Sequence, residues 1–284
     1  MKLVVFGTSE FAVPTLEALA PKHEIVGVVT QPDRPAGRGH KVVATPVKRA
    51  AERLGLPVFT PEKLKPFVED VRVLAPDAFV VASYGKIVPQ VLLDVVPIAF
   101  NVHPSLLPLY RGATPLQSAI RDGCTETGVT IIAMDAGMDT GDMLLQEKTP
   151  IEPEETYGQL HDRLAERGAA LAAEAVDRYE RGTLQRRPQS ELGIADDEIA
   201  RTLTRPLRKD DLIIDWTQPA RRIVDHVRAL APQPAARTDR FGEPLKVLRA
   251  HADCDDVVLD LVVPPGRPPM PFDVYERSRS QRVR

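Results

Sequence analysis

The stretch Ala99-Phe-Asn-Val-His-Pro-Ser-Leu-Leu-Pro108 decides the fold and the site together, because an apolar segment ends there in two polar side chains. Side chains alternate along a strand, so we expect Asn101 and His103 on one face and Val102 in the core on the other. Each proline favours extended geometry in the residue before it, so the chain should leave the strand as a stiffened loop. The pattern places an amide and an imidazole around one small volume.

An amide and an imidazole at one place suit acyl transfer to an amine, in which a carbonyl oxygen becomes negatively charged. Asn101 and His103 could hold that oxyanion, and loss of one such donor typically costs roughly a hundred- to a thousandfold in rate. The alternative is that both are polar residues at a strand end, tied to nearby backbone. For an isolated Asn-x-His we favour that alternative.

Apolar runs of strand length alternate with helical patterns through the first part of the chain. The expected strands are residues 2–6, 25–29, 78–82, 99–102 and 129–134. Such alternation is typical of an α/β fold with a Rossmann-like, mostly parallel sheet and helices on both faces. The loop at residues 7–10 lacks the G-x-G-x-x-G pattern, so nicotinamide binding is not expected.

A longer helix is expected to close the first domain. Thr156 and Gln159 fit a capping box, and Gly182 stands where a C-terminal cap belongs. Residues 183–205 are polar and lack apolar periodicity, which indicates an interdomain linker. We therefore expect a catalytic domain at residues 1–182, the linker, and a smaller C-terminal domain at residues 206–284.

Composition excludes several classes of protein. The chain has 284 residues, 43% hydrophobic and 27% charged, which fits a globular protein with one large and one small domain. No apolar run has the length of a membrane span, and the apolar start ends too early for a signal peptide, so we expect a cytoplasmic protein. Cys124 and Cys254 have neither metal-ligand nor redox spacing. A net charge of -3 argues against general nucleic-acid binding but leaves room for a local basic patch.

Several stretches together resemble one known family. Residues 101–112 (NVHPSLLPLYRG), Gly128-Val-Thr and Met138-Asp-Thr-Gly-Asp-Met-Leu are similar to the folate-dependent formyltransferases. Within that superfamily, residues 30–39 (TQPDRPAGRG) resemble the insertion loop of the methionyl-tRNA formyltransferases. The resemblance extends from Met1 to about Arg249.

The resemblance implies a catalytic set of three side chains, with Asn101, His103 and Asp139 at the matching positions. The implied reaction is attack by an amine on the formyl carbon of 10-formyltetrahydrofolate, through a tetrahedral intermediate, with no metal. Asn101 and protonated His103 would hold the oxyanion. Asp139 would stabilise the positive charge of the histidine and help a water carry the proton away from the attacking nitrogen.

Taken alone, the loop around Asp139 has two other interpretations, a solvated acidic turn or a calcium loop. The calcium interpretation is poor, because the spacing of the carboxylates differs from the Asp-x-Asp-x-Asp-Gly arrangement. The solvated turn would be favoured without the resemblance. Gly137 and Gly141 are expected to allow unusual backbone dihedrals on either side of Asp139.

The resemblance also implies a folate site at the loop after the strand. Its expected residues are Ser105, Leu106, Leu107 and Pro108, together with Ile87 and Val88. A strand-end loop with exposed apolar residues and free backbone amides could hold a flat heterocycle. For each leucine alone a place in the core is at least as good an interpretation; for the loop as a set we favour a pocket.

The resemblance of the basic loop to the insertion loop of the tRNA enzymes implies the acceptor of the formyl group. Arg34, Arg38 and Lys41 are expected to contact the acceptor arm of methionyl initiator tRNA, and the nearby glycines and proline discourage regular structure. A solvated surface loop is the alternative. We therefore expect a monomeric enzyme that formylates the α-amine of methionyl initiator tRNA. Two other hypotheses are a formyltransferase for a small amine, such as a sugar nucleotide or glycinamide ribonucleotide, and a non-catalytic tRNA-binding protein.

The C-terminal domain should be an OB-like β domain, as the resemblance implies. After Cys254, however, only residues 257–263 look like a strand, and a proline-rich segment and a basic tail follow. We expect the barrel to be incomplete.

Overall fold

The structure is a computed structural model, which describes residues 1–36 and 41–280. The chain divides into two units of internal contacts. The first unit comprises Met1–Arg111, Gly128–Lys148 and Asp162–Arg201. The second comprises Gly112–Thr127, Thr149–His161 and Thr202–Arg284. Each unit is built around its own sheet.

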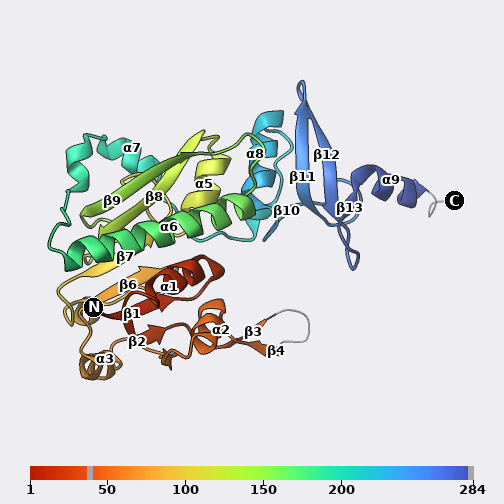
Figure 1. The fold of residues 1–284 in the computed structure, drawn as a ribbon. Helices are drawn as coiled ribbons and strands as arrows, with labels where there is room; N and C mark the ends of the chain where they lie inside the picture. The colour runs from red at the N-terminus through yellow and green to blue at the C-terminus, as the bar shows by residue number, and fades with distance from the viewer. Residues whose placement is uncertain (37–40, 281–284) are drawn as a thin grey trace. The chain divides into compact units, whose positions relative to one another are not determined.

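A seven-stranded sheet forms the first unit, in the order β5-β2-β1-β6-β7-β8-β9 (Figure 1). The strands are β1 Lys2–Gly7, β2 Glu24–Val29, β5 Val58–Phe59, β6 Ala78–Ala82, β7 Ala99–His103, β8 Glu126–Ala133 and β9 Met143–Pro150. The first five are parallel, and β8 pairs antiparallel with β7. The expected mostly parallel sheet is confirmed. Because β1 lies between β2 and β6, the strand order reverses there, and open α/β sheets bind ligands outside the carboxyl ends near such a point.

Helices cover both faces of this sheet. The helical segments of this unit are η1 Glu10–Ala12, α1 Val13–Leu19, α2 Pro46–Arg53, α3 Val68–Leu74, α4 Gln90–Leu93, α6 Tyr157–Glu180, η2 Gln189–Leu192 and α7 Asp196–Arg201. On one face, Val71 of α3 and Leu92 of α4 join a buried cluster with Phe79 of β6. On the other face α6 crosses β7, and a Cβ added to Gly168 would lie 2.8 Å from Val102.

The two faces of β7 have different neighbours. Phe100 packs edge-on against Tyr179 of α6, with 5.8 Å between ring centroids, and Val102 lies beside Gly168 of the same helix. Because side chains alternate along a strand, Asn101 and His103 must point to the opposite face. The packing of the apolar side chains of β7 thus determines the face to which its polar side chains point.

The start of α6 confirms the expected capping box. The backbone N–H of Thr156 donates to Gln159 Oε1 at 2.9 Å, and the N–H of Gln159 donates to Thr156 Oγ1 at 3.4 Å. These two bonds satisfy donors that a helix N-terminus leaves without partners. Gly182, just beyond the helix, has φ +68°, as its predicted place at the C-terminal cap requires.

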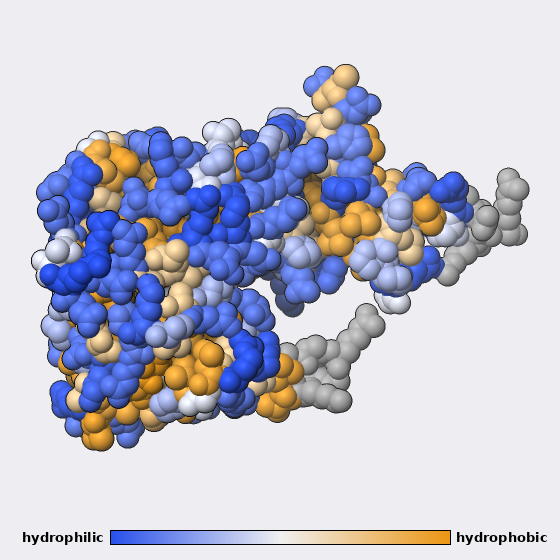
Figure 2. All heavy atoms as spheres, in the orientation of Figure 1, coloured by the Kyte–Doolittle hydropathy of each residue, from blue (hydrophilic) through white to orange (hydrophobic). Residues whose placement is uncertain are grey.

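A small hairpin lies where the sequence predicted an irregular loop. Strands β3 Arg34–Ala36 and β4 Lys41–Val43 pair antiparallel, so the expectation that the proline and glycines prevent regular structure is wrong for these flanks. Lys48 Nζ donates to Asp33 Oδ2 at 2.6 Å and ties down the base of the hairpin. Apolar surface lies over this hairpin in Figure 2, and Val42 is 67% exposed.

The second unit contains a four-stranded sheet in the order β10-β11-β12-β13, and its paired strands run antiparallel. Its elements are α5 Pro115–Arg121, η3 Asp210–Leu212, α8 Ala220–Leu230, β10 Ala236–Thr238, β11 Leu245–Asp253, β12 Asp256–Val263, β13 Met270–Pro271 and α9 Phe272–Ser280. The expected smaller β domain is confirmed. Ile213 adds a single parallel bridge to Arg237.

Helix α9 follows the proline-rich segment and was not expected. Phe272 packs against Phe241 with 4.9 Å between ring centroids, and Tyr275 is fully buried. Burial of these aromatic rings stabilises a helix that its mostly polar sequence does not indicate. None of the helices within residues 1–36 and 41–280 is long and apolar enough to cross a membrane.

Gly112 generates the first testable prediction. It has φ +109°, and an added Cβ would lie 2.2 Å from the carbonyl oxygen of Thr204. Gly112→Ala should therefore lower the free energy of unfolding by roughly 3 kcal/mol, because strain in the dihedral adds to a backbone clash. Gly182→Ala is the matched control, since its φ is +68° but nothing lies within 4 Å, and about 1 kcal/mol is expected. Equal losses for both variants in urea denaturation would contradict the predicted clash.

Candidate active site

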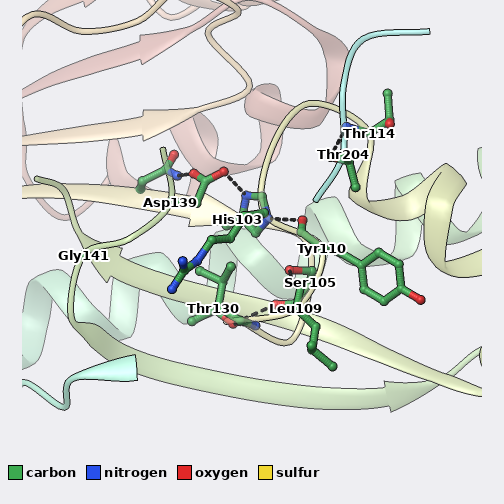
Figure 3. Close-up of polar contacts among 12 residues, drawn as sticks. His103, Ser105, Leu109, Tyr110, Thr114, Thr130, Asp139, Gly141 and Thr204 are labelled. Atoms are coloured by element: carbon green, nitrogen blue, oxygen red, sulfur yellow. Dashed lines mark hydrogen bonds and ion pairs between the residues drawn. The ribbon is translucent and has the colours of Figure 1, made fainter. Parts of the chain in front are cut away.

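The three polar side chains predicted from the sequence meet in the structure. Asn101 Nδ2 donates to Asp139 Oδ1 at 3.2 Å, and His103 Nδ1 lies 3.5 Å from Asp139 Oδ2. The side chain of His103 is 5% exposed and that of Asp139 is 15% exposed. One carboxylate thus contacts both the amide and the imidazole in a largely buried place (Figure 3).

The ring of His103 lies between two acceptors. Its Nε2 is 3.0 Å from the carbonyl oxygen of Tyr110, on the side opposite to Asp139 (Figure 3). A neutral imidazole has one N–H, whereas the imidazolium has two. Only the protonated ring can donate to the carbonyl and to the carboxylate at once. The two ring nitrogens of His103 thus face acceptors on opposite sides.

Asp139 itself has an unusual backbone. Its φ is +57°, in the left-handed region that residues with a Cβ seldom occupy. The expectation that Gly137 and Gly141 supply such dihedrals is wrong, because the left-handed residue is the aspartate between them. The glycines are needed for space instead: an added Cβ would lie 1.9 Å from Thr140 Oγ1 at Gly137 and 1.8 Å from the Ala133 carbonyl at Gly141.

The loops after strands β1, β2 and β6 meet beside this region of the sheet. Thr8 Oγ1 and Gln31 Nε2 both donate to the carbonyl of Tyr84, at 2.7 and 2.9 Å. Burial raises the pKa of the Tyr84 phenol to about 12, so the phenol stays neutral at any physiological pH. These contacts hold the loops after β1 and β2 against the loop after β6 at the carboxyl edge of the sheet. The loop after β6 continues to Ile87.

The six residues expected to bind folate have very different exposures. Ser105, Leu107, Pro108 and Val88 are buried, Leu106 is partly buried, and Ile87 is 91% exposed. Leu107 fills a core cluster with Ile132 and Met143, and Val88 belongs to the larger core. The interpretation as core residues therefore describes these two side chains. Leu106 and Ile87 are the apolar side chains of this set that can still reach a ligand.

The backbone after β7 is also largely engaged. The N–H of Leu107 donates to Thr130 Oγ1 at 3.2 Å, and the N–H of Ser105 donates to the carbonyl of His103 at 3.0 Å. The Ser105 hydroxyl donates to the carbonyl of Leu109 at 2.7 Å. The amides of residues 105 and 107 are therefore engaged within the protein. These bonds make the turn rigid.

The predicted tRNA-contacting residues are only partly described. Arg34 lies on β3 and is exposed. Arg38 lies outside the described residues, and so does the side chain of Lys41.

One residue of the site had no signal in the sequence. Gln189, in the segment expected to be a plain linker, is 6% exposed, and its Nε2 donates to the carbonyls of Asp139 and Gly141, at 2.8 Å each. The backbones of Arg187 and Met143 also exchange two hydrogen bonds. Part of the segment expected to be a linker thus lies at the site.

Comparison with known proteins identifies the family. A family model described as formyl transferase matches residues 1–176, and one for the formyl transferase C-terminal domain matches residues 206–266. The chain belongs to the formyltransferase family. It is 46% identical over 271 residues to a methionyl-tRNA formyltransferase from Roseiflexus sp. (strain RS-1), covering 94% of this chain and 80% of the relative. With the Roseiflexus castenholzii enzyme of the same name it shares 42% identity, covering 98% and 96%.

Solved structures show the same fold at lower identity. An N-formyltransferase from Helicobacter canadensis, in complex with folinic acid and dTDP-3-aminofucose, superimposes with a TM-score of 0.67 and 21% identity. The match covers 88% of this chain and 87% of that one. The formyltransferase fold is therefore shared by proteins that are distant in sequence.

A possible metal cluster lies elsewhere in the first unit. Among the described residues, one group of three possible ligands comes together, His23, Asp177 and Glu180, with ligand atoms within 4.8 Å of one another. Asp177 already pairs with Lys22, and Glu180 pairs with the Met1 ammonium. These positive charges oppose a divalent cation, so the cluster carries no metal assignment.

The left-handed backbone of Asp139 generates a prediction about stability. Asp139→Gly and Asp139→Ala both remove the carboxylate, so their difference isolates the backbone. Asp139→Gly should be more stable by about 1 kcal/mol, because only alanine has a Cβ that clashes in this conformation. Urea denaturation of the two variants measures the difference. If the Asp139→Ala variant were as stable as the Asp139→Gly variant, the left-handed backbone at residue 139 would be contradicted.

Proposed function

We propose that this formyltransferase transfers the formyl group of 10-formyltetrahydrofolate to the α-amine of methionyl initiator tRNA. The observation that carries the chemistry is the meeting of Asn101, His103 and Asp139 at the end of β7. The acceptor rests on identities of 42–46% to relatives named methionyl-tRNA formyltransferase, which this chain matches over 94% or more of its length. The folate donor is supported by the family and by a folinic acid complex of a neighbour with the same fold.

In the proposed reaction, the nitrogen of the methionyl group attacks the formyl carbon and forms a tetrahedral intermediate. Asn101 has two N–H groups, one of which donates to Asp139. The other can donate to the oxyanion. A protonated His103, held between Asp139 and the Tyr110 carbonyl, adds a positive charge beside it.

A proton must leave the attacking nitrogen as the carbon–nitrogen bond to folate breaks. The Asp139 carboxylate lies at the centre of the three side chains and can accept that proton through a water. Transfer of that proton to the departing folate nitrogen completes the reaction and returns Asp139 to its starting carboxylate form. The chain's own residues supply both the oxyanion contacts and the proton path.

For the folate donor we propose contacts with Leu106 and Ile87, since these side chains retain exposed surface at the carboxyl edge of the sheet. Ser105, Leu107, Pro108 and Val88 would act beneath them as a rigid support. An exposed isoleucine beside an ordered turn suits a flat heterocycle, which gains binding energy when it covers apolar surface.

For tRNA we propose contacts with the hairpin, through Arg34, Arg38 and Lys41. Its base is anchored by the Lys48–Asp33 ion pair, and its exposed Val42 offers apolar surface beside the charges. Phosphates bind arginine and lysine, and splayed bases stack on side chains. We further propose a monomeric, cytoplasmic enzyme with the domain division at residues 182 and 206.

The experiment that tests this function is an incubation of the protein with 10-formyltetrahydrofolate and methionyl initiator tRNA, with a panel of small amines in parallel. We expect formyl-methionyl-tRNA. Asn101→Ala, His103→Ala and Asp139→Ala should each lower kcat roughly a hundred- to a thousandfold, because each removes a group that acts in the transition state. Binding of tRNA, measured by filter retention, should change little.

Three other outcomes would redirect the proposal. Product with a small amine alone would keep the chemistry and change the acceptor. Retention of tRNA without any product would favour a non-catalytic binding protein. Normal kcat combined with lost binding in the three variants would contradict their catalytic roles.

The hairpin gives a second test. Arg38→Ala should raise the KM for tRNA and make binding less dependent on salt, because one phosphate contact is lost. Arg72→Ala on α3 is the control, since that exposed arginine pairs with Glu69 and lies outside the hairpin. KM and salt dependence equal to the control would remove Arg38 from the interface.

A further inference from the structure

Gln189 makes a set of contacts that links the polar segment after α6 to the site. Its side chain is buried, and its Nε2 donates to the carbonyl oxygens of Asp139 and Gly141, at 2.8 Å each. Both carbonyls belong to the loop in which Asp139 has φ +57°. A strained conformation persists only when its surroundings hold it. Gln189 bonds the carbonyl of the strained residue itself and the carbonyl two residues after it.

Arg111 fixes which end of the Gln189 amide faces the loop. Its Nε and Nη2 both donate to Gln189 Oε1, at 3.2 and 2.7 Å. An arginine can only donate and a backbone carbonyl can only accept. A residue between them must therefore accept at one end and donate at the other. A glutamine amide does both, whereas a glutamate carboxylate cannot donate to the two carbonyls.

These contacts close a ring that includes the proposed catalytic histidine. Arg111 follows Tyr110, whose carbonyl meets His103 Nε2 at 3.0 Å, and His103 Nδ1 faces Asp139. From Asp139 the path returns through Gln189 to Arg111. The imidazole of His103 and the carboxylate of Asp139 are thereby held from both sides. Neither group can shift without breaking one of the contacts in this closed series.

We propose that Gln189 is a positioning residue, which holds the backbone of Asp139 so that its carboxylate meets Asn101 and His103. The inference rests on the proposed formyl transfer for its kinetic consequence, but its structural part stands by itself. Anchoring of the linker does not require this side chain, because the backbones of Arg187 and Met143 already exchange bonds of 2.8 and 2.9 Å. What the side chain adds is its hold on the loop.

The test compares Gln189→Ala and Gln189→Glu with Ser190→Ala, a neighbour whose side chain is exposed. The first variant removes the contacts, and the second keeps size and an acceptor for Arg111 while it places a carboxylate against two carbonyls. Steady-state kinetics with 10-formyltetrahydrofolate and methionyl initiator tRNA, and hydrogen–deuterium exchange of residues 138–142, are the readouts. Circular dichroism and thermal melting check that each variant folds.

We expect both Gln189 variants to lower kcat about ten- to a hundredfold, with each KM within about threefold of wild type, because a misplaced group affects the transition state more than binding. Exchange in residues 138–142 should become at least about tenfold faster, since the bonds that hold the loop are lost. Ser190→Ala should behave as wild type.

A kcat within twofold of wild type, with unchanged exchange in the loop, would overturn the proposal. A normal kcat in Gln189→Glu alone would also overturn it, because a role in packing tolerates that isosteric change and a role as donor does not. If the wild-type enzyme forms no product with any acceptor, the proposed function fails, and exchange alone decides about Gln189. If Gln189→Ala does not fold, the isosteric Gln189→Glu carries both measurements.

Discussion

The packing of β7 against α6 is the constraint on which the site depends. Phe100 and Val102 contact Tyr179 and Gly168 of that helix, so the alternation of side chains sends Asn101 and His103 to the other face. A shift of one residue in the pairing of β7 would bury the two polar groups against the helix and expose the apolar ones. The hydrophobic packing of β7 therefore determines the face on which the proposed catalytic side chains lie.

The antiparallel neighbour completes this arrangement. Strand β8 pairs with β7 so that Asn101 lies opposite Ile132 and Phe100 opposite Ala133. The chain then leaves β8 and, within a few residues, reaches Asp139, which is close to the polar face of β7. A short excursion between two strands thus brings a carboxylate 38 residues from Asn101 into contact with it. Local geometry, rather than long-range docking, assembles the three groups.

The sequence was sufficient for the features that depend on local patterns. The strands around β1, β2, β6, β7 and β8 appear as apolar runs, and Thr156, Gln159 and Gly182 mark the ends of α6 by their capping chemistry. Asn101 and His103 follow from period-two alternation. Their assignment to one site with Asp139 came from the resemblance of motifs, since nothing in the spacing of 38 residues shows contact.

Other features depend on tertiary contacts that no local pattern contains. Gln189 lies in a polar segment, and its importance comes from carbonyls and a guanidinium that only the fold brings to it. Helix α9 has a mostly polar sequence but packs its buried Tyr275 against Phe272. Unusual backbone dihedrals were expected at Gly137 and Gly141, but the positive φ is found at Asp139. Contacts of the Asp139 side chain with Asn101 and His103, and of its carbonyl with Gln189, compensate for the strain. Such a reversal is typical of functional loops, where local preference is overridden.

The order in which the chain contributes to the second unit has a consequence for its synthesis. Helix α5 packs against α8, and Arg222 Nη1 donates to the carbonyl of Arg121 at 3.2 Å, although 101 residues separate them. At translation rates of about 5–20 residues per second, α5 leaves the ribosome roughly 5–20 s before its partner exists. Its apolar side chains Leu116, Ala119 and Ile120 are buried in the finished protein, and any of this surface that α8 covers stays exposed until α8 is made. Synonymous codons that slow translation between residues 121 and 220 would prolong that interval and reduce the yield of folded protein, although the amino-acid sequence stays the same.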